Sequence, residues 1–278
     1  MQHQPAPAPA LASVTRRPFG RTLLSLVTLG SLWIVQPIHR SSAPILRRHD
    51  VPDSLYVQLG SRYSSIVHIN LPVPRGAADC EGTLIAPRWV LTAAHVTAEI
   101  TPGHLVTVAG EAYTVDSVIR HPDWDAGPND LALVRLERSV VGVRPAHLYR
   151  GSEEIDRVVV LVGYGDVGTG LSGPIGSDRQ VRGATNRVDA ASDFWLKMLF
   201  DSPESPRTTP LEGVSGPGDS GGPAYLEGGD EEVVVGVSSG QSTRATGGEL
   251  GRYGVTEFYT RVSRYVPWIE SITGLLPS

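Results

Sequence analysis

The sequence predicts an all-β fold, either a barrel or a sandwich. Short β-branched runs recur along the chain, and clusters of turn-forming residues such as Pro102-Gly103 separate them. Glycine (31) and proline (22) are abundant among the 278 residues, which favours many short strands over long helices. Nothing repeats at a fixed period, and strands do not alternate with long helices as they would around a parallel sheet.

Nine runs are predicted to be strands because β-branched and apolar residues dominate them. They are residues 65–69, 83–86, 89–92, 105–108, 113–119, 131–136, 158–162, 233–237 and 257–262. One helix is predicted over residues 263–272, where Tyr265, Trp268, Ile269 and Ile272 follow helical spacing.

Composition excludes several classes of protein. Apolar residues make up 40% of the chain, which is enough for a packed core and argues against disorder. Residues 1–48 hold six arginines and no acid, so residues 49–278 carry 18 basic and 29 acidic groups. Such an acidic body repels phosphate backbones and excludes nucleic-acid binding by charge. The single cysteine, Cys80, excludes an intramolecular disulfide and a cysteine-rich metal cluster.

Residues 1–48 are predicted to be an export signal and possible pro-segment. Arg16 and Arg17 precede the apolar run 22–35, a pattern typical of signal peptides. The run would cover about 21 Å as a helix, less than the roughly 30 Å of a bilayer core, so no stable membrane span is expected after processing. The paired arginines resemble a twin-arginine signal, which predicts an extracellular or periplasmic protein. An uncleaved anchor or a wrongly assigned start is the alternative.

Residues 218–223 (GDSGGP) are the strongest chemical signal in the chain. Three glycines around Ser220 allow a tight backbone path on which N–H groups converge beside the hydroxyl. Acyl transfer needs this arrangement, because the hydroxyl attacks a carbonyl and the N–H groups stabilise the resulting oxyanion.

Two further segments supply what a serine nucleophile lacks. His95, at the end of LTAAH (91–95), can accept the hydroxyl proton, since histidine titrates near neutral pH. Asp130, in NDLALV (129–134), is a candidate for orienting His95 and stabilising the imidazolium. Alone, either residue would more often be structural, and only their combination with Ser220 favours catalysis.

The motifs TAAH, NDLAL and GDSGGP, in the order His, Asp, Ser, resemble the trypsin/chymotrypsin-like serine endopeptidases. The likeness covers residues 49–278 and includes Gly163-Tyr164-Gly165. It is closest to a bacterial-type, disulfide-poor member. It implies two six-stranded antiparallel β-barrels, an active-site cleft between them and a C-terminal helix. It also implies polypeptide substrates.

The resemblance assigns roles residue by residue. Ser220 would be the nucleophile, His95 the general base and acid, and Asp130 the orienting carboxylate. The backbone N–H groups of Gly218 and Ser220 would form the oxyanion hole. Ser238-Ser239-Gly240 stands where the family has a Ser-Trp-Gly stretch that pairs with substrate, so Ser238 and Gly240 are predicted to bind it.

Specificity is expected from Val214 and Glu257. Val214 lies six residues before the nucleophile, at the base of the family's primary pocket, where members that cut after Lys or Arg usually hold aspartate. Glu257 falls at another pocket-lining position and could favour a basic or mixed side chain; alternatively it faces solvent or pairs with Arg252 or Arg261. We expect a small-to-medium apolar or mixed pocket.

This sequence departs from the family pattern in ways that limit which family features can be expected of it. Only 34 residues separate His95 from Asp130, which leaves little room for a calcium-binding loop, so neither metal nor cofactor is expected. Relatives are activated by cutting before an Ile-Val-Gly-Gly-like start whose ammonium pairs with the acid preceding the serine, here Asp219. No such start appears near residues 48–56. Cleavage after Arg47 or Arg48 could leave His49 or a nearby residue to approach Asp219, or another group could satisfy this carboxylate.

The sequence therefore predicts a secreted, monomeric serine endopeptidase with a Ser-His-Asp triad and an acyl-enzyme intermediate. Two alternatives remain: a non-catalytic protease-like binding protein, and a hydrolase acting mainly on esters. A groove that pairs with substrate backbone would distinguish a peptidase from an esterase.

Overall fold

The computed structural model describes residues 34–35, 45–73, 76–176 and 178–275. All of them belong to the second of two compact units, residues 32–278. The first unit, residues 1–31, lies outside the described residues, and so does the arginine pair of the predicted export signal. Within the described residues, the helices are all too short or too polar to span a bilayer.

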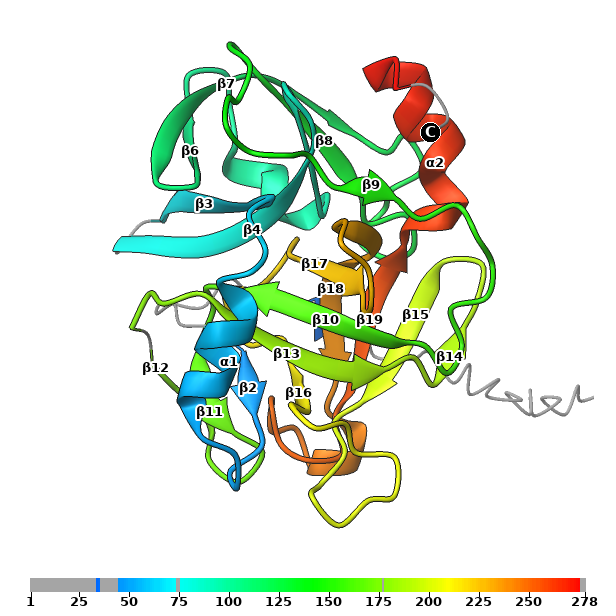
Figure 1. Ribbon diagram of the computed structural model, residues 1–278. Helices are drawn as coiled ribbons and strands as arrows, with labels where there is room; N and C mark the ends of the chain where they lie inside the picture. The colour runs from blue at the N-terminus through cyan, green and yellow to red at the C-terminus, as the bar shows by residue number, and fades with distance from the viewer. Residues whose placement is uncertain (1–33, 36–44, 74–75, 177, 276–278) are drawn as a thin grey trace, which may run out of the picture. The chain divides into compact units, whose positions relative to one another are not determined.

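The first lobe is a closed six-stranded antiparallel barrel, drawn in cyan to green in Figure 1. Around the barrel the strands follow the order β3-β4-β5-β8-β7-β6. They are β3 (Ile66–Val73), β4 (Gly76–Ala86), β5 (Trp89–Thr92), β6 (Leu105–Val108), β7 (Glu111–Arg120) and β8 (Ala132–Leu136). In β3, Val67, Ile69 and Leu71 alternate with polar residues and are fully buried, as expected for a strand with one face on the core.

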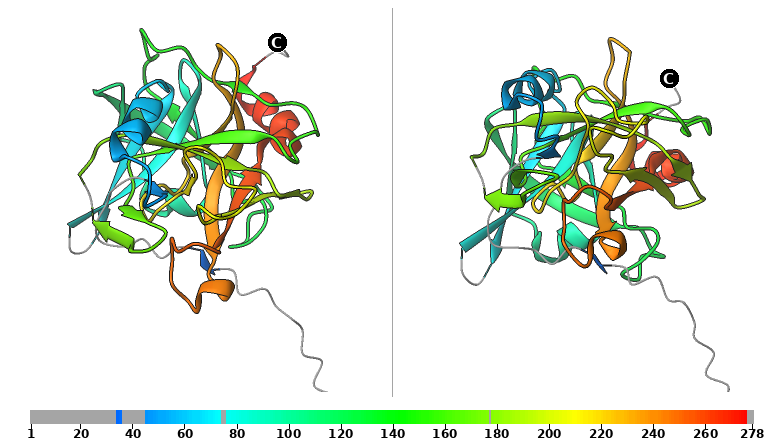
Figure 2. Two further views of the ribbon diagram at one scale, coloured as in Figure 1. Left: turned by 60° about the horizontal axis from the view of Figure 1, so that its bottom comes forward. Right: turned by 90° about the horizontal axis from the view of Figure 1, so that it is seen from below.

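The second lobe is built on an antiparallel sheet in the order β13-β10-β17-β18-β19-β15-β14. The strands are β10 (Val158–Gly163), β13 (Arg182–Arg187), β14 (Ala190–Ala191), β15 (Trp195–Leu199), β17 (Pro223–Leu226), β18 (Val233–Ser242) and β19 (Thr256–Arg261). Two short strands, β1 (Ile34–Val35) and β9 (His147–Leu148), also pair with β18. Figure 2 shows β18 running beside β19, which leads into the C-terminal helix.

A side chain links the two ends of this sheet. The buried amide of Asn186 in β13 donates hydrogen bonds to the carbonyl oxygens of Leu199 (3.1 Å) in β15 and Gly213 (2.9 Å). The six strands from β13 to β15 therefore curve round into a half-barrel whose ends approach each other. A mostly β protein with one closed barrel and a second curved sheet agrees with the predicted fold class.

A smaller sheet completes the second lobe in the order β12-β11-β2-β16. Its strands are β2 (Leu46–Arg47), β11 (Val167–Thr169), β12 (Gly173–Gly176) and β16 (Gly213–Val214). Because β2 pairs with both β11 and β16, the segment just before His49 is part of the folded lobe.

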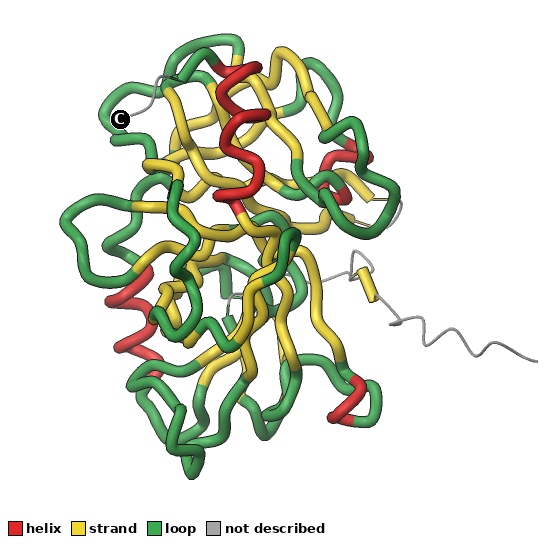
Figure 3. The backbone as a smooth tube through the Cα atoms, turned by 90° about the vertical axis from the view of Figure 1, so that its right-hand side faces the viewer, coloured by secondary structure: helices red, strands yellow, loops and turns green. Residues whose placement is uncertain are grey.

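Two α-helices and two 3₁₀ helices, η1 (His95–Glu99) and η2 (Arg244–Thr246), accompany the strands. The predicted C-terminal helix is confirmed as α2 (Val262–Thr273), and it buries Val262, Tyr265, Val266 and Ile269 in the same core as the first barrel. Figures 1 and 3 show α2 beside the first lobe and α1 (Asp53–Gly60) beside the second.

The sequence did not predict α1, because its eight residues lack a clear apolar stripe. Tertiary contacts hold it instead. Tyr56 is fully buried in the second-lobe core, and Asp53 forms an ion pair with the buried Arg182 guanidinium (2.7 Å). Each of the nine predicted strands overlaps an observed one, whereas β13, β15 and β17 were missed, as were the shorter strands β1, β2, β9, β11, β12, β14 and β16. In β13 most of the buried side chains are polar and Ala184 alone packs in the apolar core, so the strand has no run of apolar residues that would predict it.

Replacing Asn186 with alanine should lower the free energy of unfolding by about 2 kcal/mol, because the buried Gly213 carbonyl and the partly buried Leu199 carbonyl lose their donor. Chemical denaturation monitored by circular dichroism would measure this. Gln180→Ala, an exposed amide, is the matched control and should change little. An Asn186→Ala protein as stable as the control would show that the side-chain link contributes nothing.

Candidate active site

His95 and Asp130 lie in direct contact at one end of the first barrel. His95 opens η1 just after β5, and Asp130 precedes β8. Asp130 Oδ2 lies 2.7 Å from His95 Nδ1, and Asp130 Oδ1 accepts a hydrogen bond from the His95 backbone N–H (2.9 Å). Both side chains are buried. This two-point contact fixes the imidazole, and Nε2 has no hydrogen-bond partner among the described residues.

The chain reaches Asp130 through a left-handed residue. Asn129 has φ +66°, a conformation that asparagine tolerates better than most residues. Its side chain is held at both ends: the amide donates to the Asp123 carbonyl (3.0 Å), and the amide oxygen accepts from the Tyr265 hydroxyl (3.0 Å). The asparagine of the NDLAL motif thus forms the turn that aims Asp130 inward.

Ser239 is a second donor to Asp130 that sequence reasoning missed. Its hydroxyl donates to Asp130 Oδ2 (2.6 Å). The β18–β19 register shifts between Ser238 and Gly240, and such a bulge re-aims a side chain. Ser239 therefore turns toward Asp130. Only the strand register, which the sequence does not give, could have revealed this.

The protonation of Asp130 follows from these contacts. Burial raises its pKa, but the nearby His95 and the hydrogen bonds from His95 and Ser239 outweigh burial, and the net pKa falls below the usual value. Asp130 is therefore an anion at neutral pH and can stabilise a protonated imidazole.

The loop that carries Ser220 has a shape that only glycine permits at two positions. Gly218 has φ +105° and Gly221 has φ +82°. At Gly221 a Cβ would also lie 2.2 Å from Thr92 Oγ1 and 2.4 Å from the Glu81 carbonyl oxygen. The residue after the nucleophile is thus pressed against the strand that leads to His95.

Backbone hydrogen bonds hold Ser220 across the two lobes. The Ser220 carbonyl accepts from the Glu81 N–H (2.8 Å), and Gly221 N–H donates to the Ser238 carbonyl (2.9 Å). Ser220 itself is partly exposed. His95 and Asp130 therefore come from the first lobe, and Ser220 comes from a second-lobe loop whose backbone packs against that lobe. Among the described residues, no hydrogen bond joins the Ser220 hydroxyl to His95 Nε2.

Asp219 has a partner that was not predicted. Asp219 is buried, and its carboxylate accepts hydrogen bonds from the backbone N–H groups of Gly165 (2.6 Å), Gly216 (2.6 Å) and Ile45 (3.1 Å). In the uncut chain His49 contacts the Tyr253 hydroxyl (2.9 Å) instead of Asp219. The group that reaches this carboxylate from the N-terminal side is Ile45.

Val214 and Glu257 both lie in the second lobe and are completely buried. The Glu257 carboxylate accepts hydrogen bonds from the backbone N–H and hydroxyl of Ser215, and Gln241 donates to the Ser215 carbonyl (2.7 Å). Burial raises the pKa of Glu257 to about 7. Neither alternative for Glu257 holds, because its side chain is not exposed and its hydrogen-bond partners, Ser215 and Gln241, are neutral.

Ser238 and Gly240 differ in whether their backbones can pair with a further strand. The backbone N–H and carbonyl of Ser238 both bond within the nucleophile loop, to Gly222 (2.8 Å) and Gly221 (2.9 Å). Gly240 instead lies on an edge that accepts another strand: β1 pairs antiparallel with β18, with Val35 opposite Gly240.

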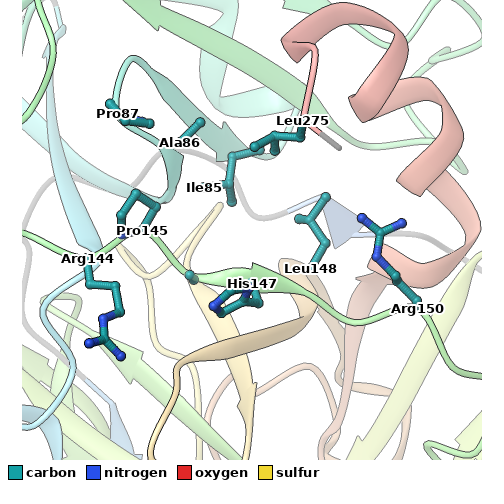
Figure 4. Close-up of a pocket in the computed structure, with 10 residues that line it drawn as sticks. Ile85, Ala86, Pro87, Arg144, Pro145, His147, Leu148, Arg150 and Leu275 are labelled. Carbon is teal, nitrogen blue, oxygen red and sulfur yellow. The ribbon is translucent and has the colours of Figure 1, made fainter. Parts of the chain in front are cut away.

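A separate apolar pocket of about 300 Å³ lies between the β4–β5 turn, β9 and Leu275 (Figure 4). None of the predicted site residues lines it. In the part of the chain that the structure describes, no group of three or more His, Cys, Asp or Glu side chains is placed to hold a metal ion. Cys80 is buried in the barrel core as a free thiol, and burial raises its pKa.

Comparison with known proteins gives consistent results. The family model described as Trypsin matches residues 60–269. Serine protease SP24D of Anopheles gambiae is 31% identical over 211 residues, which cover 70% of this chain and 72% of that protein. Granzyme M of Homo sapiens is 30% identical over 220 residues, covering 72% and 81%. A solved structure described as HL collagenase matches 77% of this chain and 95% of its own with a TM-score of 0.59; at 20% identity it supports the fold alone.

Replacing Ser239 with alanine should lower kcat on a peptide substrate by about ten- to a hundredfold, because a hydrogen bond to a buried carboxylate is lost. Steady-state kinetics would measure this, with Ser271→Ala on the exposed face of α2 as control. Unchanged kcat in a folded Ser239→Ala protein would mean that His95 alone orients Asp130.

Proposed function

Because the chain belongs to the trypsin family of serine endopeptidases, we propose that it cleaves peptide bonds through a triad of Ser220, His95 and Asp130. The observation that carries this proposal is the 2.7 Å contact between Asp130 and His95 Nδ1, which leaves Nε2 as the available base. The family acts on polypeptides, and the chain is a serine-type endopeptidase.

In the first half-reaction, His95 Nε2 takes the proton of the Ser220 hydroxyl as the oxygen attacks the substrate carbonyl carbon. The imidazolium that forms is stabilised by ionised Asp130 at Nδ1. The carbonyl oxygen becomes an oxyanion, for which the N–H groups of Gly218 and Ser220 are the proposed donors. The left-handed conformation of Gly218 supports this role, because it turns the backbone of the loop sharply just before Ser220.

Collapse of the tetrahedral intermediate transfers the proton from His95 to the leaving amine and leaves an acyl group on Ser220. Water then attacks the acyl carbon while His95 Nε2 removes its proton. A second collapse returns that proton to Ser220 and releases the new carboxylate.

Peptide substrates are favoured over simple esters by the edge of β18. An extended peptide can add to an open strand through backbone hydrogen bonds. Gly240 and Gln241 lie on such an edge, since β1 pairs with them. An enzyme acting mainly on esters would have no use for such a strand-binding edge.

The primary pocket is proposed to have Val214 at its base and Glu257 in its wall. An apolar base suits small-to-medium apolar side chains. Glu257 is neutral below about pH 7 and carries a negative charge above it, so a basic substrate side chain would be attracted only at higher pH.

Export is proposed from the N-terminal sequence. The basic and apolar N-terminal segment supports secretion to the periplasm or outside the cell. We propose that the exported protein acts as a monomer without metal or cofactor.

A fluorophosphonate probe should label the wild-type chain at Ser220, because the probe reacts only with a serine activated by its base and an oxyanion hole. Ser220→Ala should abolish labelling, and Ser152→Ala, an exposed serine, should not change it. In-gel fluorescence and mass spectrometry of the labelled peptide would show both. A folded wild-type protein that does not label would favour the binding-protein alternative.

For peptides that differ only in the residue before the scissile bond, the ratio of kcat/KM for Arg to that for Leu should rise about tenfold between pH 6 and pH 8. Effects of pH on the catalytic step that are common to both substrates cancel in the ratio. Glu257→Gln should make the ratio independent of pH. A ratio in wild type that does not change with pH would remove Glu257 from the pocket wall.

A further inference from the structure

The Asp219 carboxylate is held by neutral donors. Its partners are the backbone N–H groups of Gly165, Gly216 and Ile45. In the uncut chain Ile45 follows Pro44, so its nitrogen is an amide with one hydrogen and no charge. A buried carboxylate surrounded only by amides retains a large desolvation cost, and one further donor would lower it.

Glu81 is the side chain placed to supply that donor. It lies in β4 and is fully buried. Its Oε1 accepts a hydrogen bond from the Tyr164 N–H. Its Oε2 is buried and has no hydrogen-bond partner among the described residues.

The free oxygen of Glu81 and the Asp219 carboxylate share one small space. A Cβ at Gly163 would lie 2.1 Å from Asp219 Oδ1 and 3.1 Å from Glu81 Oε2. A Cβ at Gly222 would lie 2.4 Å from Glu81 Oε2 and 2.9 Å from the Asp219 carbonyl oxygen. The two carboxyl groups therefore occupy the volume that glycine leaves empty on both sides.

Two buried carboxylates this close cannot both be charged. Burial and the charge of Asp219 raise the pKa of Glu81 well above its ordinary value. Burial also raises the pKa of Asp219, to about 6, but its backbone donors oppose this rise. At neutral pH the stable arrangement is a protonated Glu81 beside an ionised Asp219.

We propose that Glu81 is a positioning residue for the catalytic loop: it keeps a proton on Oε2 and donates it to Asp219. Asp219 immediately precedes Ser220, so this bond fixes the loop that presents Ser220 and Gly218. The Glu81 backbone supports the same loop, because its N–H donates to the Ser220 carbonyl (2.8 Å) and its carbonyl accepts from the Thr92 hydroxyl (2.6 Å). The effect of this bond on the reactivity of Ser220 rests on the proposed function, whereas the proton shared by Glu81 and Asp219 does not.

The other titratable groups near Glu81 do not neutralise it. Asp79 and Cys80 precede it on β4, and Tyr164 follows β10. Asp79 is itself paired with His68 (2.8 Å) and adds negative charge. Cys80 and Tyr164 are neutral at pH 7, because their pKa values are raised. The charge of Asp79 therefore favours the protonated form of Glu81, whereas the hydrogen bond from the Tyr164 backbone opposes it and is outweighed by burial and by the charge of Asp219.

Thermal unfolding of the full chain tests the shared proton without requiring activity. Unfolded Glu81 loses its proton near pH 4.5, whereas folded Glu81 keeps it to higher pH, so wild type loses stability as pH rises through that window. Glu81→Gln retains the shape and an N–H donor but cannot ionise. The Tm of Glu81→Gln minus that of wild type should therefore increase from pH 5 to pH 8, and Glu137→Gln, an exposed control, should show no trend. A constant difference would overturn the proposal.

Fluorophosphonate labelling tests the positioning role. At pH 7, Glu81→Gln should label within about threefold of wild type, since it still donates to Asp219. Glu81→Met, which fills the space without a donor, should label at least tenfold more slowly. Labelling by wild type should also fall at alkaline pH, and Glu81→Gln should lack this fall.

A folded Glu81→Gln protein that labels more than tenfold more slowly than wild type would overturn the positioning role. A Glu81→Gln protein whose labelling falls at alkaline pH as that of wild type does would also overturn it. Failure of the proposed function looks different: wild type itself would not label, while the unfolding experiment would still report the shared proton. If Glu81→Met does not fold, the Gln variant and its pH profile decide the matter.

Discussion

The buried carboxylate of Asp219 is the contact on which the active-site architecture depends. It accepts backbone hydrogen bonds from three segments far apart in the sequence, at Ile45, Gly165 and Gly216. Each bond satisfies a buried N–H group, and together they set the backbone path of the loop that carries Ser220. The same carboxylate dictates local sequence, because a Cβ at Gly163 or Gly165 would lie within 2.5 Å of its Oδ1. The Gly-Tyr-Gly motif is therefore a consequence of burying this charge.

Both lobes contribute to orienting the reactive groups, so the chemistry depends on how they pack. The first barrel supplies the His95–Asp130 pair, and the second lobe reaches that pair through Ser239 and through the Thr260 hydroxyl, which donates to the Asp130 carbonyl (3.0 Å). These hydrogen bonds are buried, where a missing partner costs the desolvation of the group left behind. A shift of one lobe against the other would break several of them at once.

The sequence predicted the fold class, nine strand positions, the C-terminal helix and the family, because these depend on local periodicity and on motifs whose glycines are required by backbone geometry. It did not predict α1 or β13, whose positions depend on tertiary contacts such as the Asp53–Arg182 ion pair. Ser239 was missed because a strand bulge decides which side chain faces Asp130. Ile45 was missed because a backbone N–H carries no sequence signature.

The absence of a disulfide framework makes buried polar contacts more important than in a cross-linked relative. Cys80 packs in the barrel core as a free thiol, so the loop entropy that a disulfide would remove from the unfolded chain is not removed. Stability must come from the folded state, through close packing and fully satisfied polar groups such as Arg182, which binds Asp53 and Asp178 at once. In such a protein a buried carboxyl group without a hydrogen-bond donor would lower the stability of the folded state considerably. A proton shared between Glu81 and Asp219 removes this loss at the point where the catalytic loop needs to be most rigid.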